Sequence, residues 1–472
     1  MYDLCYVISF GFAARMLLQT GLIERLTEQG KTVAIITPDP NDPNLRELDS
    51  NPRVAVFALR EKYKLWDEDY LFKRKYYLED IKANPALWEK HVHGLWYSRS
   101  RHPWRRIRPL YYYLIHRLIP YFPIIRQRFV AQEKSYLASA EAAALLDKIQ
   151  PALLVSTYPV NFLEAKLLHA AKEKSIPTLL HLLSWDNITS KGKFPVIADY
   201  FIVWGAIMYE ELQSYYGIPA AHIYTCGVPH FDNHIERQQN PQYREQLRTM
   251  GLDPAAPFLF FAMSAQRFAP REIDIVERLA REIEAGTYGA DLQLVVRPHP
   301  QNLQGHMASE SWLGRLKALP SQRVAVDFPR MHSSALKWSI QKEDMNHLSD
   351  LLVGCSICLN SGATISIEAL LVDKPVLLTS FDADAQLSYW KSARRLVDYT
   401  HLRKFVDLGG ATIVHSYAEM DRAIRHYLAH PEADREKRQR ARFRECYRDD
   451  GHATERVVAA VDDLLVQLTT KV

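Results

Sequence analysis

The chain has 472 residues, of which 47% are hydrophobic and 24% are charged, and 59 Lys and Arg against 55 Asp and Glu give a net charge of +4. This length predicts about two to three domains, so a single small module is excluded, and the composition excludes a disordered chain. The even charge balance does not indicate nucleic-acid binding, and we expect no nucleic-acid partner.

The N-terminal segment and the cysteines both favour a cytoplasmic protein. Residues 1–12, MYDLCYVISFGF, lack the basic region and the cleavage site of a signal peptide, and no stretch reaches the roughly 18 apolar residues that a membrane-spanning helix needs. The five cysteines are scattered, as is typical of reduced thiols. Cys355 and Cys358 form a C-x-x-C in a predicted buried strand without a second ligand pair, so we expect no metal site.

Short apolar segments alternate with helical patterns along the whole chain. This alternation predicts βα units and parallel sheets, and the continuous hydrophobicity of FLFFAM or KPVLLTS predicts strands covered on both faces. The strands predicted in the first half are 2–9, 32–37, 54–59, 152–157, 178–183, 200–203 and 222–226. Those predicted in the second half are 258–263, 292–296, 324–328, 350–359, 375–380 and 412–415.

A polar segment rich in proline and glycine, between Asp232 and Pro254, predicts the boundary between two domains. We expect a Rossmann-like N-terminal domain over residues 1–235, with an insertion over about 60–132. A second Rossmann-like domain is expected over 236–452. The helical spacing of apolar residues after position 453 predicts a terminal helix over 453–472.

The insertion mixes arginine with aromatic residues. Residues 90–132 contain no Asp or Glu, and their arginines are Arg99, Arg101, Arg105, Arg106, Arg108, Arg117, Arg126 and Arg128. Arginine with amphipathic aromatics is typical of an anionic membrane interface, so we expect an anionic membrane surface as a partner and a peripheral location on the inner face of the cell membrane. A helical insertion with solvated arginines, and a single-stranded nucleic-acid surface, are the alternatives.

The segment VVRPHPQN places Arg297 and His299 at the C-terminal end of a predicted strand. Ligands of open α/β sheets bind outside the carboxyl ends of the strands, so we expect both side chains to contact the phosphates of a nucleotide. Pro298 and Pro300 restrict the backbone around His299, whose imidazole can donate a hydrogen bond to a phosphate oxygen. Alternatively, His299 caps a turn.

The segment LNSGATISIEALL predicts a strand, a turn of small residues and a helix that starts near Ile365. Backbone N–H groups at such a helix start bind anions. We therefore expect Ser361, Gly362 and Thr364 to hold phosphate and Glu368 to accept hydrogen bonds from ribose hydroxyls, as acidic residues do in dinucleotide sites. Alternatively, Glu368 only stabilises the helix N-terminus. Ser264, after the first strand of the second half, is a further candidate for donor binding.

Asp186 follows the fifth predicted strand, within HLLSWDNITSKGKFP. A carboxylate at this edge of the sheet is a candidate general base for an acceptor hydroxyl, and Asn187, Ser190 and Lys191 are candidates for substrate contact. Alternatively, Asp186 closes an Asx turn. Gly11 lies in another turn between a strand and a helix, where the backbone can approach the substrate.

Other common site motifs are missing from the sequence. The chain has no G-x-G-x-x-G followed by a fitting acid, no G-x-x-x-x-G-K-[ST], no H-E-x-x-H and no G-x-S-x-G. Dehydrogenase, P-loop NTPase, metalloprotease and serine hydrolase activities are therefore disfavoured.

Four segments together resemble the GT-B glycosyltransferases: RPHP, SGATISIEALLVDKPVLL, GVPHFD before the boundary and DDGHATERVV before the final helix. Within GT-B, the chain is most similar to bacterial cell-envelope enzymes, namely capsule or O-antigen sugar transferases with an HP motif and the CDP-glycerol glycerophosphotransferase type. The resemblance implies two facing Rossmann-like domains, with the donor nucleotide bound by the C-terminal domain, and a last helix that crosses back to the N-terminal domain. It implies no resident cofactor.

The chain departs from the glycerophosphotransferases at two motifs. Trp185-Asp186-Asn187 stands where they carry His-Gly, and Asn360-Ser361-Gly362-Ala363 stands where they carry Asp-Tyr-Ser-Ser. The departures favour metal-independent transfer of a sugar from a nucleotide donor to a hydroxyl of a glycan or lipid-linked acceptor, with Asp186 as base. A UDP-sugar 2-epimerase, a glycerophosphotransferase and a noncatalytic glycan-binding relative are the alternatives.

Overall fold

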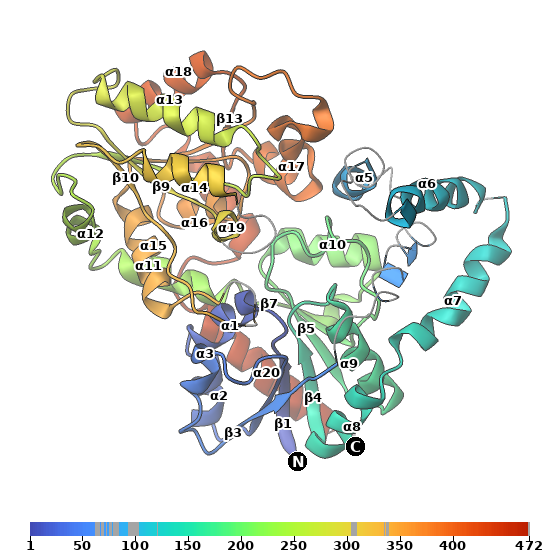
Figure 1. The fold of residues 1–472 in the computed structure, drawn as a ribbon. Helices are drawn as coiled ribbons and strands as arrows, with labels where there is room; N and C mark the ends of the chain where they lie inside the picture. The colour runs from blue at the N-terminus through green and yellow to red at the C-terminus, as the bar shows by residue number, and fades with distance from the viewer. Residues whose placement is uncertain are drawn as a thin grey trace.

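Two parallel β-sheets, one in each half of the chain, form the framework of the computed structural model (Figure 1). The structure describes residues 1–61, 67, 70–71, 73–74, 78, 85–92, 103–119, 121–303, 309–334, 336 and 339–470. The N-terminal sheet has the strand order β3-β2-β1-β4-β5-β6-β7, and the C-terminal sheet has the order β10-β9-β8-β11-β12-β13. In both sheets the order reverses beside the first strand, as in doubly wound folds that bind ligands at this point.

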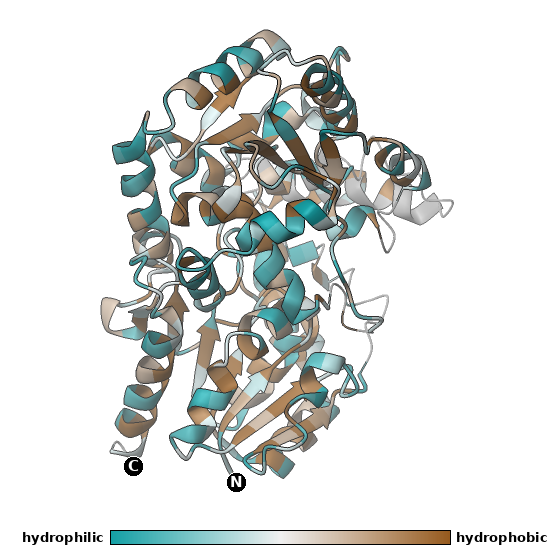
Figure 2. Cartoon of the chain, turned by 90° about the vertical axis from the view of Figure 1, so that its left-hand side faces the viewer, coloured by the Kyte–Doolittle hydropathy of each residue, from teal (hydrophilic) through white to brown (hydrophobic). Residues whose placement is uncertain are grey.

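The strands of the N-terminal sheet are β1 (Tyr2–Val7), β2 (Val33–Thr37), β3 (Val54–Ala58), β4 (Pro151–Ser156), β5 (Thr178–His181), β6 (Tyr200–Val203) and β7 (Ile223–Thr225). Those of the C-terminal sheet are β8 (Phe258–Ala262), β9 (Gln293–Arg297), β10 (Val324–Val326), β11 (Ile357–Asn360), β12 (Val376–Thr379) and β13 (Thr412–Val414). Every residue of β2 and β8 is buried, because helices cover both faces of each sheet. Figure 2 shows the strands as hydrophobic and the outer helix faces as hydrophilic.

One predicted strand was too long. Residues 350–354 end a helix, α15 (Lys342–Gly354), and β11 begins only at Ile357. The apolar run after Asp350 packs as the buried face of this helix, and the Asp350 carboxylate accepts two hydrogen bonds from Arg237, at 2.9 and 2.6 Å. The apolar segment 350–359, predicted as one strand, therefore contains the end of α15 and the start of β11.

The helices of the N-terminal half are α1 (Gly11–Leu18), α2 (Leu22–Glu28), α3 (Pro43–Arg46), α5 (Pro85–Val92), α6 (Pro103–Leu118), α7 (Pro123–Leu137), α8 (Ala140–Ile149), α9 (Phe162–Glu173) and α10 (Ala206–Tyr216). Those of the C-terminal half are α11 (Asp232–Arg237), α12 (Tyr243–Thr249), α13 (Glu272–Glu284), α14 (Glu310–Lys317), α15, α16 (Ile365–Leu371), α17 (Thr400–Asp407), α18 (Tyr417–Ala429), α19 (Arg435–Cys446) and α20 (Ala453–Thr469). Within the described ranges, no helix is long and apolar enough to cross a membrane.

The last helix, α20, crosses back to the N-terminal domain, as predicted (Figure 1). Its apolar face is buried at Val457, Val461 and Leu464. Two of its acidic side chains form ion pairs with the N-terminal domain: Glu455 pairs with Arg25 of α2, and Asp462 pairs with Lys31 in the loop before β2. The two sheets lie on either side of residues 232–254, where the domain boundary was predicted.

Candidate active site

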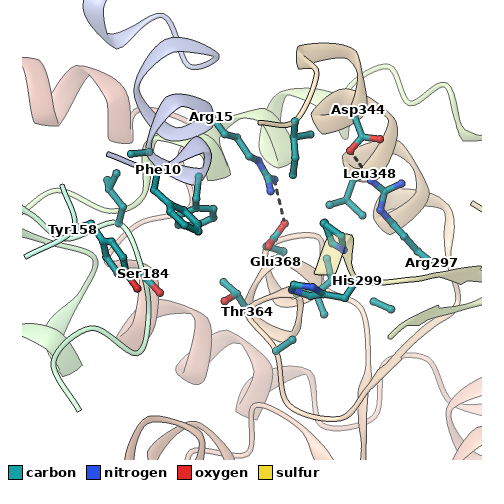
Figure 3. Close-up of a pocket in the computed structure, with 18 of the residues that line it drawn as sticks. Phe10, Arg15, Tyr158, Ser184, Arg297, His299, Asp344, Leu348, Thr364 and Glu368 are labelled. Atoms are coloured by element: carbon teal, nitrogen blue, oxygen red, sulfur yellow. Dashed lines mark hydrogen bonds and ion pairs between the residues drawn. The ribbon is translucent and has the colours of Figure 1, made fainter. Parts of the chain in front are cut away.

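A cavity of about 290 Å³ lies between the two domains, at the carboxyl ends of strands from both sheets (Figure 3). From the N-terminal domain it is lined by Phe10, Phe12, Ala13, Arg15, Thr157, Tyr158, Leu183, Ser184, Asn187 and Lys191. From the C-terminal domain it is lined by Ala262, Met263, Arg297, Pro298, His299, Pro300, Ile340, Asp344, Leu348, Ala363, Thr364, Ile365 and Glu368. The cavity therefore joins the sequence segments that were predicted to form one site.

Arg297 lines the cavity, but two carboxylates occupy its guanidinium. Its Nη1 donates to Asp327, and its Nη2 donates to Asp344 at 2.5 Å. The side chain is buried, and a buried charge needs a partner of opposite sign because its desolvation is costly. Arg297 and His299 were predicted to contact the phosphates together, and both line the cavity, but the charge of Arg297 is already balanced within the C-terminal domain.

Arg15 of α1 is the cavity arginine that the sequence analysis missed. It is buried, and its Nε and Nη2 have no hydrogen-bond partner in the described part of the chain. The nearest carboxylate oxygen that pairs with it, Oε2 of Glu368, is 3.9 Å from Nη2 (Figure 3). Its sequence signal is a single charge within the buried apolar helix GFAARMLL. Donors in this position can bind a phosphate oxygen.

Glu368 points into the cavity from α16, as predicted (Figure 3). Its Oε2 lies 2.9 Å from Nε2 of the buried His234. Burial acts to raise the pKa of Glu368, but the hydrogen bond from His234 and the charges of His234 and Arg15 outweigh burial and keep the pKa below its ordinary value. Glu368 is therefore an ionised acceptor of hydrogen bonds at neutral pH.

His299 caps a turn and also faces the cavity. Its Nδ1 accepts a hydrogen bond from the backbone N–H of Gln301 at 3.1 Å, which caps a short 3₁₀ turn, and its ring also lines the cavity. Burial lowers the pKa of His299 to about 4, so the ring is neutral at pH 7. Because Nδ1 accepts, the proton of the neutral ring is on Nε2, which makes this atom a hydrogen-bond donor.

The turn before α16 is held by contacts within the fold. Oδ1 of Asn360 accepts the N–H groups of Gly362 and Ala363 at 2.7 and 2.9 Å, and Oγ of Ser361 donates to Glu272 at 2.5 Å. Ser361 and Gly362 were expected to hold phosphate, but neither lines the cavity, and the Ser361 hydroxyl and the Gly362 N–H are engaged within the fold. Thr364 does line the cavity.

Ser264 was predicted to bind the donor, and the structure places it beside Glu272 instead. Its N–H donates to Oε2 of Glu272 at 2.7 Å, and its carbonyl accepts from Asn302 at 2.9 Å. It is buried and is not among the lining residues. Gly11 is likewise behind the wall, although its neighbours Phe10 and Phe12 line the cavity.

Asp186 is the centre of a polar cluster behind the cavity wall. Its carboxylate accepts hydrogen bonds from Ser184 at 2.6 Å and Ser190 at 3.0 Å, and pairs with Lys191 at 2.9 Å. Burial acts to raise the pKa of Asp186, but the charge of Lys191 and the hydrogen bonds keep it well below its ordinary value. So low a pKa makes Asp186 a weak proton acceptor. Two neighbours of Asp186, Asn187 and Lys191, do line the cavity.

The N-terminal wall of the cavity is aromatic. The rings of Phe10 and Tyr158 lie 5.8 Å apart, and the Lys191 ammonium is 5.0 Å from the centre of the Tyr158 ring. Figure 3 shows Phe10 and Tyr158 facing His299 and Glu368 across the cavity. Among the described residues, no group of His, Cys, Asp or Glu side chains could hold a metal ion.

Comparisons with known proteins support the fold and reach no closer relationship. No family model matches the sequence, and no curated protein matches it. A Listeria monocytogenes protein described as a UDP-N-acetylglucosamine 2-epimerase has a similar structure, with 12% identity, 98% of this chain and 97% of that chain covered, and a TM-score of 0.57.

Two further solved structures cover nearly the whole chain. The UDP-GlcNAc 2-epimerase from Neisseria meningitidis bound to UDP-GlcNAc is 12% identical, with 98% and 99% of the two chains covered and a TM-score of 0.53. A glycosyltransferase from Rickettsia africae is 11% identical, with 99% and 98% covered and a TM-score of 0.51. The chain therefore has the two-domain GT-B fold that glycosyltransferases and nucleotide-sugar epimerases share.

Proposed function

We propose that the protein is a glycosyltransferase that moves a sugar from a nucleoside diphosphate to an acceptor hydroxyl. The observation that carries the proposal is the buried Arg15 at a cavity between two Rossmann-like domains: within the described ranges its Nε and Nη2 make no hydrogen bond, and its ion-pair partner Glu368 is 3.9 Å away. A buried guanidinium with unused hydrogen-bond donors is unfavourable, so an anionic ligand that accepts these hydrogen bonds gains affinity.

The donor fits the part of the cavity lined by His299 and Glu368 of the C-terminal domain, which Arg15 reaches from α1 of the N-terminal domain. The diphosphate oxygens accept hydrogen bonds from Arg15 and from Nε2 of His299, and the ionised Glu368 accepts hydrogen bonds from the ribose hydroxyls. In the reaction, the bond between the anomeric carbon and the phosphate oxygen breaks as the acceptor oxygen attacks the anomeric carbon, and the proton of the acceptor hydroxyl passes to an oxygen of the departing phosphate. Negative charge then develops on the departing nucleotide, where the donors of Arg15 and His299 stabilise it.

The acceptor fits the N-terminal side. The aromatic rings of Phe10, Phe12 and Tyr158 offer faces on which a sugar ring can stack, and Lys191 and Asn187 offer hydrogen-bond donors beside them. This second wall supports transfer over epimerisation, because an epimerase needs no acceptor. The sequence resemblance supports a hydroxyl of a bacterial surface glycan, of the capsule or O-antigen kind, as the acceptor.

Ligand screening and product analysis test the proposal together. In a thermal-shift screen of UDP, GDP, CDP, CMP and dTDP, we expect one nucleoside diphosphate to raise the melting temperature more than CMP does. A ligand that binds the folded state more tightly raises the melting temperature more, and a diphosphate offers more oxygens to Arg15 and His299 than a monophosphate does. The corresponding nucleotide sugar should then be consumed only when an acceptor glycan is present.

Incubation with the donor alone separates the alternatives. Formation of the 2-epimer without an acceptor would show that the protein is an epimerase. Nucleotide binding without turnover in any glycan extract would show a noncatalytic relative, and glycerol phosphate transfer from CDP-glycerol would show a glycerophosphotransferase.

A further inference from the structure

Helices α6 and α7 form an arm, residues 103–137, that leaves many large apolar side chains in contact with solvent. Of the 15 exposed large hydrophobic residues in the described part of the chain, nine lie between positions 107 and 130. They are Ile107, Leu110, Tyr111, Leu114, Leu118, Tyr121, Phe122, Ile124 and Val130. Such a concentration is unusual for a surface that only faces water, and it marks an interaction surface.

Four aliphatic residues of α6 form a continuous stripe. Ile107, Leu110, Leu114 and Leu118 follow one another at intervals of three and four residues, so they share one face of the helix. Their exposed fractions are 56%, 49%, 54% and 44%, so about half of each apolar side chain faces solvent. The stripe is thus available for a partner.

The corner between α6 and α7 continues this apolar surface. Tyr121 is 78% exposed, and Phe122 and Ile124 are 53% and 55% exposed. Figure 1 shows the two helices at the outer edge of the molecule, with their junction directed away from both sheets. The arm can therefore meet a broad flat partner without hindrance from the two domains.

The same surface is positively charged. Arg117, Arg126 and Arg128 are exposed, and none of the ion pairs found in the described ranges involves them. The sequence from 90 to 132 contains no acidic residue that could balance their charge. A partner that covers the arm must therefore be anionic as well as apolar.

We propose that the α6–α7 arm binds the surface of an anionic lipid bilayer. A bilayer accounts for the aliphatic stripe, the exposed tyrosines and the arginines of the arm. The aliphatic side chains would enter the acyl region, the tyrosines would lie at headgroup depth, and the arginines would pair with lipid phosphates. A second copy of this chain, bound through the same surface, would place uncompensated arginines opposite one another. A nucleic acid would leave the aliphatic stripe exposed, since bases stack on aromatic side chains.

Vesicle flotation with the full-length protein tests the proposal. The probes are vesicles of phosphatidylcholine alone and of equal parts phosphatidylcholine and phosphatidylglycerol. We expect binding to the mixed vesicles, weaker binding to the neutral ones, and a loss of binding as salt rises, because the Debye length shrinks from about 10 Å at 0.1 M to about 3 Å at 1 M. Equal partitioning onto both vesicles, or none onto either, would overturn the proposal.

Two sets of variants separate the apolar from the electrostatic contribution. Replacing Arg117, Arg126 and Arg128 by glutamine should lower affinity for the mixed vesicles about fivefold per residue, on the order of 100-fold in all. The matched control replaces three exposed arginines elsewhere, Arg46, Arg248 and Arg435, and should bind like the parent. A control triple that loses as much affinity as the arm triple would refute a role of the arm.

The second set removes the stripe. Leu110→Ser with Leu114→Ser should abolish binding even at low salt, whereas Phe443→Ser, which changes a residue that is 60% exposed on α19, should not. All variants change exposed side chains, and circular dichroism with a melting curve checks that each remains folded. Sedimentation without vesicles completes the test: a stable dimer that the stripe variant dissociates would assign the arm to a second copy instead.

Discussion

Replacing Arg15 by methionine should weaken nucleotide binding without lowering the stability of the protein. Methionine has a similar length and fills the same buried space, but it has no charge and donates no hydrogen bond. In the described part of the chain, Nε and Nη2 of Arg15 make no hydrogen bond, and an unsatisfied buried polar group costs about 1–3 kcal/mol. Glu368, 3.9 Å from Nη2, keeps its closer partner His234 when Arg15 is removed. We therefore expect Arg15→Met to unfold at the same temperature as the parent or a higher one.

Affinity for the preferred nucleoside diphosphate should fall. A hydrogen bond to a charged group contributes about 1.5–3 kcal/mol, so the loss of two donor atoms should weaken binding by at least about 3 kcal/mol, on the order of 100-fold in Kd. Arg15 is only 8% exposed, so solvent screening reduces this little. Arg15→Lys keeps the positive charge without the planar guanidinium, so its affinity for the nucleotide should lie between those of the parent and Arg15→Met.

Isothermal titration with the nucleotide, together with a melting curve for each variant, makes this measurement. Arg25→Met is the matched control, because Arg25 is a half-exposed arginine on the neighbouring helix α2 and lies outside the cavity. If Arg15→Met binds the nucleotide as tightly as the parent, the diphosphate does not contact Arg15. The donor site would then have to be placed elsewhere.

Three further outcomes follow from the site and from the contact between the domains. His299→Ala and Glu368→Gln should each weaken nucleotide binding about tenfold in the same titration without a change in fold, and unchanged affinity in both would contradict the donor site. Asp186→Asn should reduce turnover less than tenfold, since the pKa of Asp186 lies well below its ordinary value; a loss of 10²–10⁴, typical of a general base, would restore that role. The ion pair of Asp186 stabilises the fold above the unfolded-state pKa of about 3.9, so the melting temperatures of parent and Asp186→Asn should converge only as the pH falls through the lower folded-state pKa. Glu445 accepts a hydrogen bond from Nε1 of Trp185 in the other domain, and burial with the nearby charge of Glu211 raises the pKa of Glu445 to about 8. The folded-state pKa of Glu445 exceeds its unfolded-state value of about 4.3, so the stability of the parent declines as the pH rises between these two values. Glutamine does not titrate, so the melting temperature of Glu445→Gln should rise relative to that of the parent from pH 5 to pH 8. A difference that stays constant over this range would refute the argument.

The fold could be predicted because it depends on local patterns. Apolar β-branched runs, polar loops and the spacing of Val457, Val461 and Leu464 each indicate one element, and the parallel topology follows from their alternation. The error at residues 350–354 arose where this local pattern was ambiguous: an apolar helix end and a buried strand look alike in sequence. What distinguishes them here is a distant partner, Arg237, which pairs with Asp350 at the helix surface.

The site was only half predictable, because sequence shows which segments approach one another but not which charges pair. Arg297 stands in a conspicuous motif, RPHP, and the structure engages it with Asp327 and Asp344, which lie 30 and 47 residues away in the chain. Arg15 stands in an inconspicuous helix, and among the described residues it pairs with a single carboxylate, that of Glu368, which His234 already shares. The capacity to bind an anion depends on the charge left unbalanced after folding, and that remainder is a property of long-range contacts. For this reason the proposed phosphate contact is assigned to Arg15, whose donors are left unused by the described residues, rather than to Arg297, whose charge two carboxylates balance.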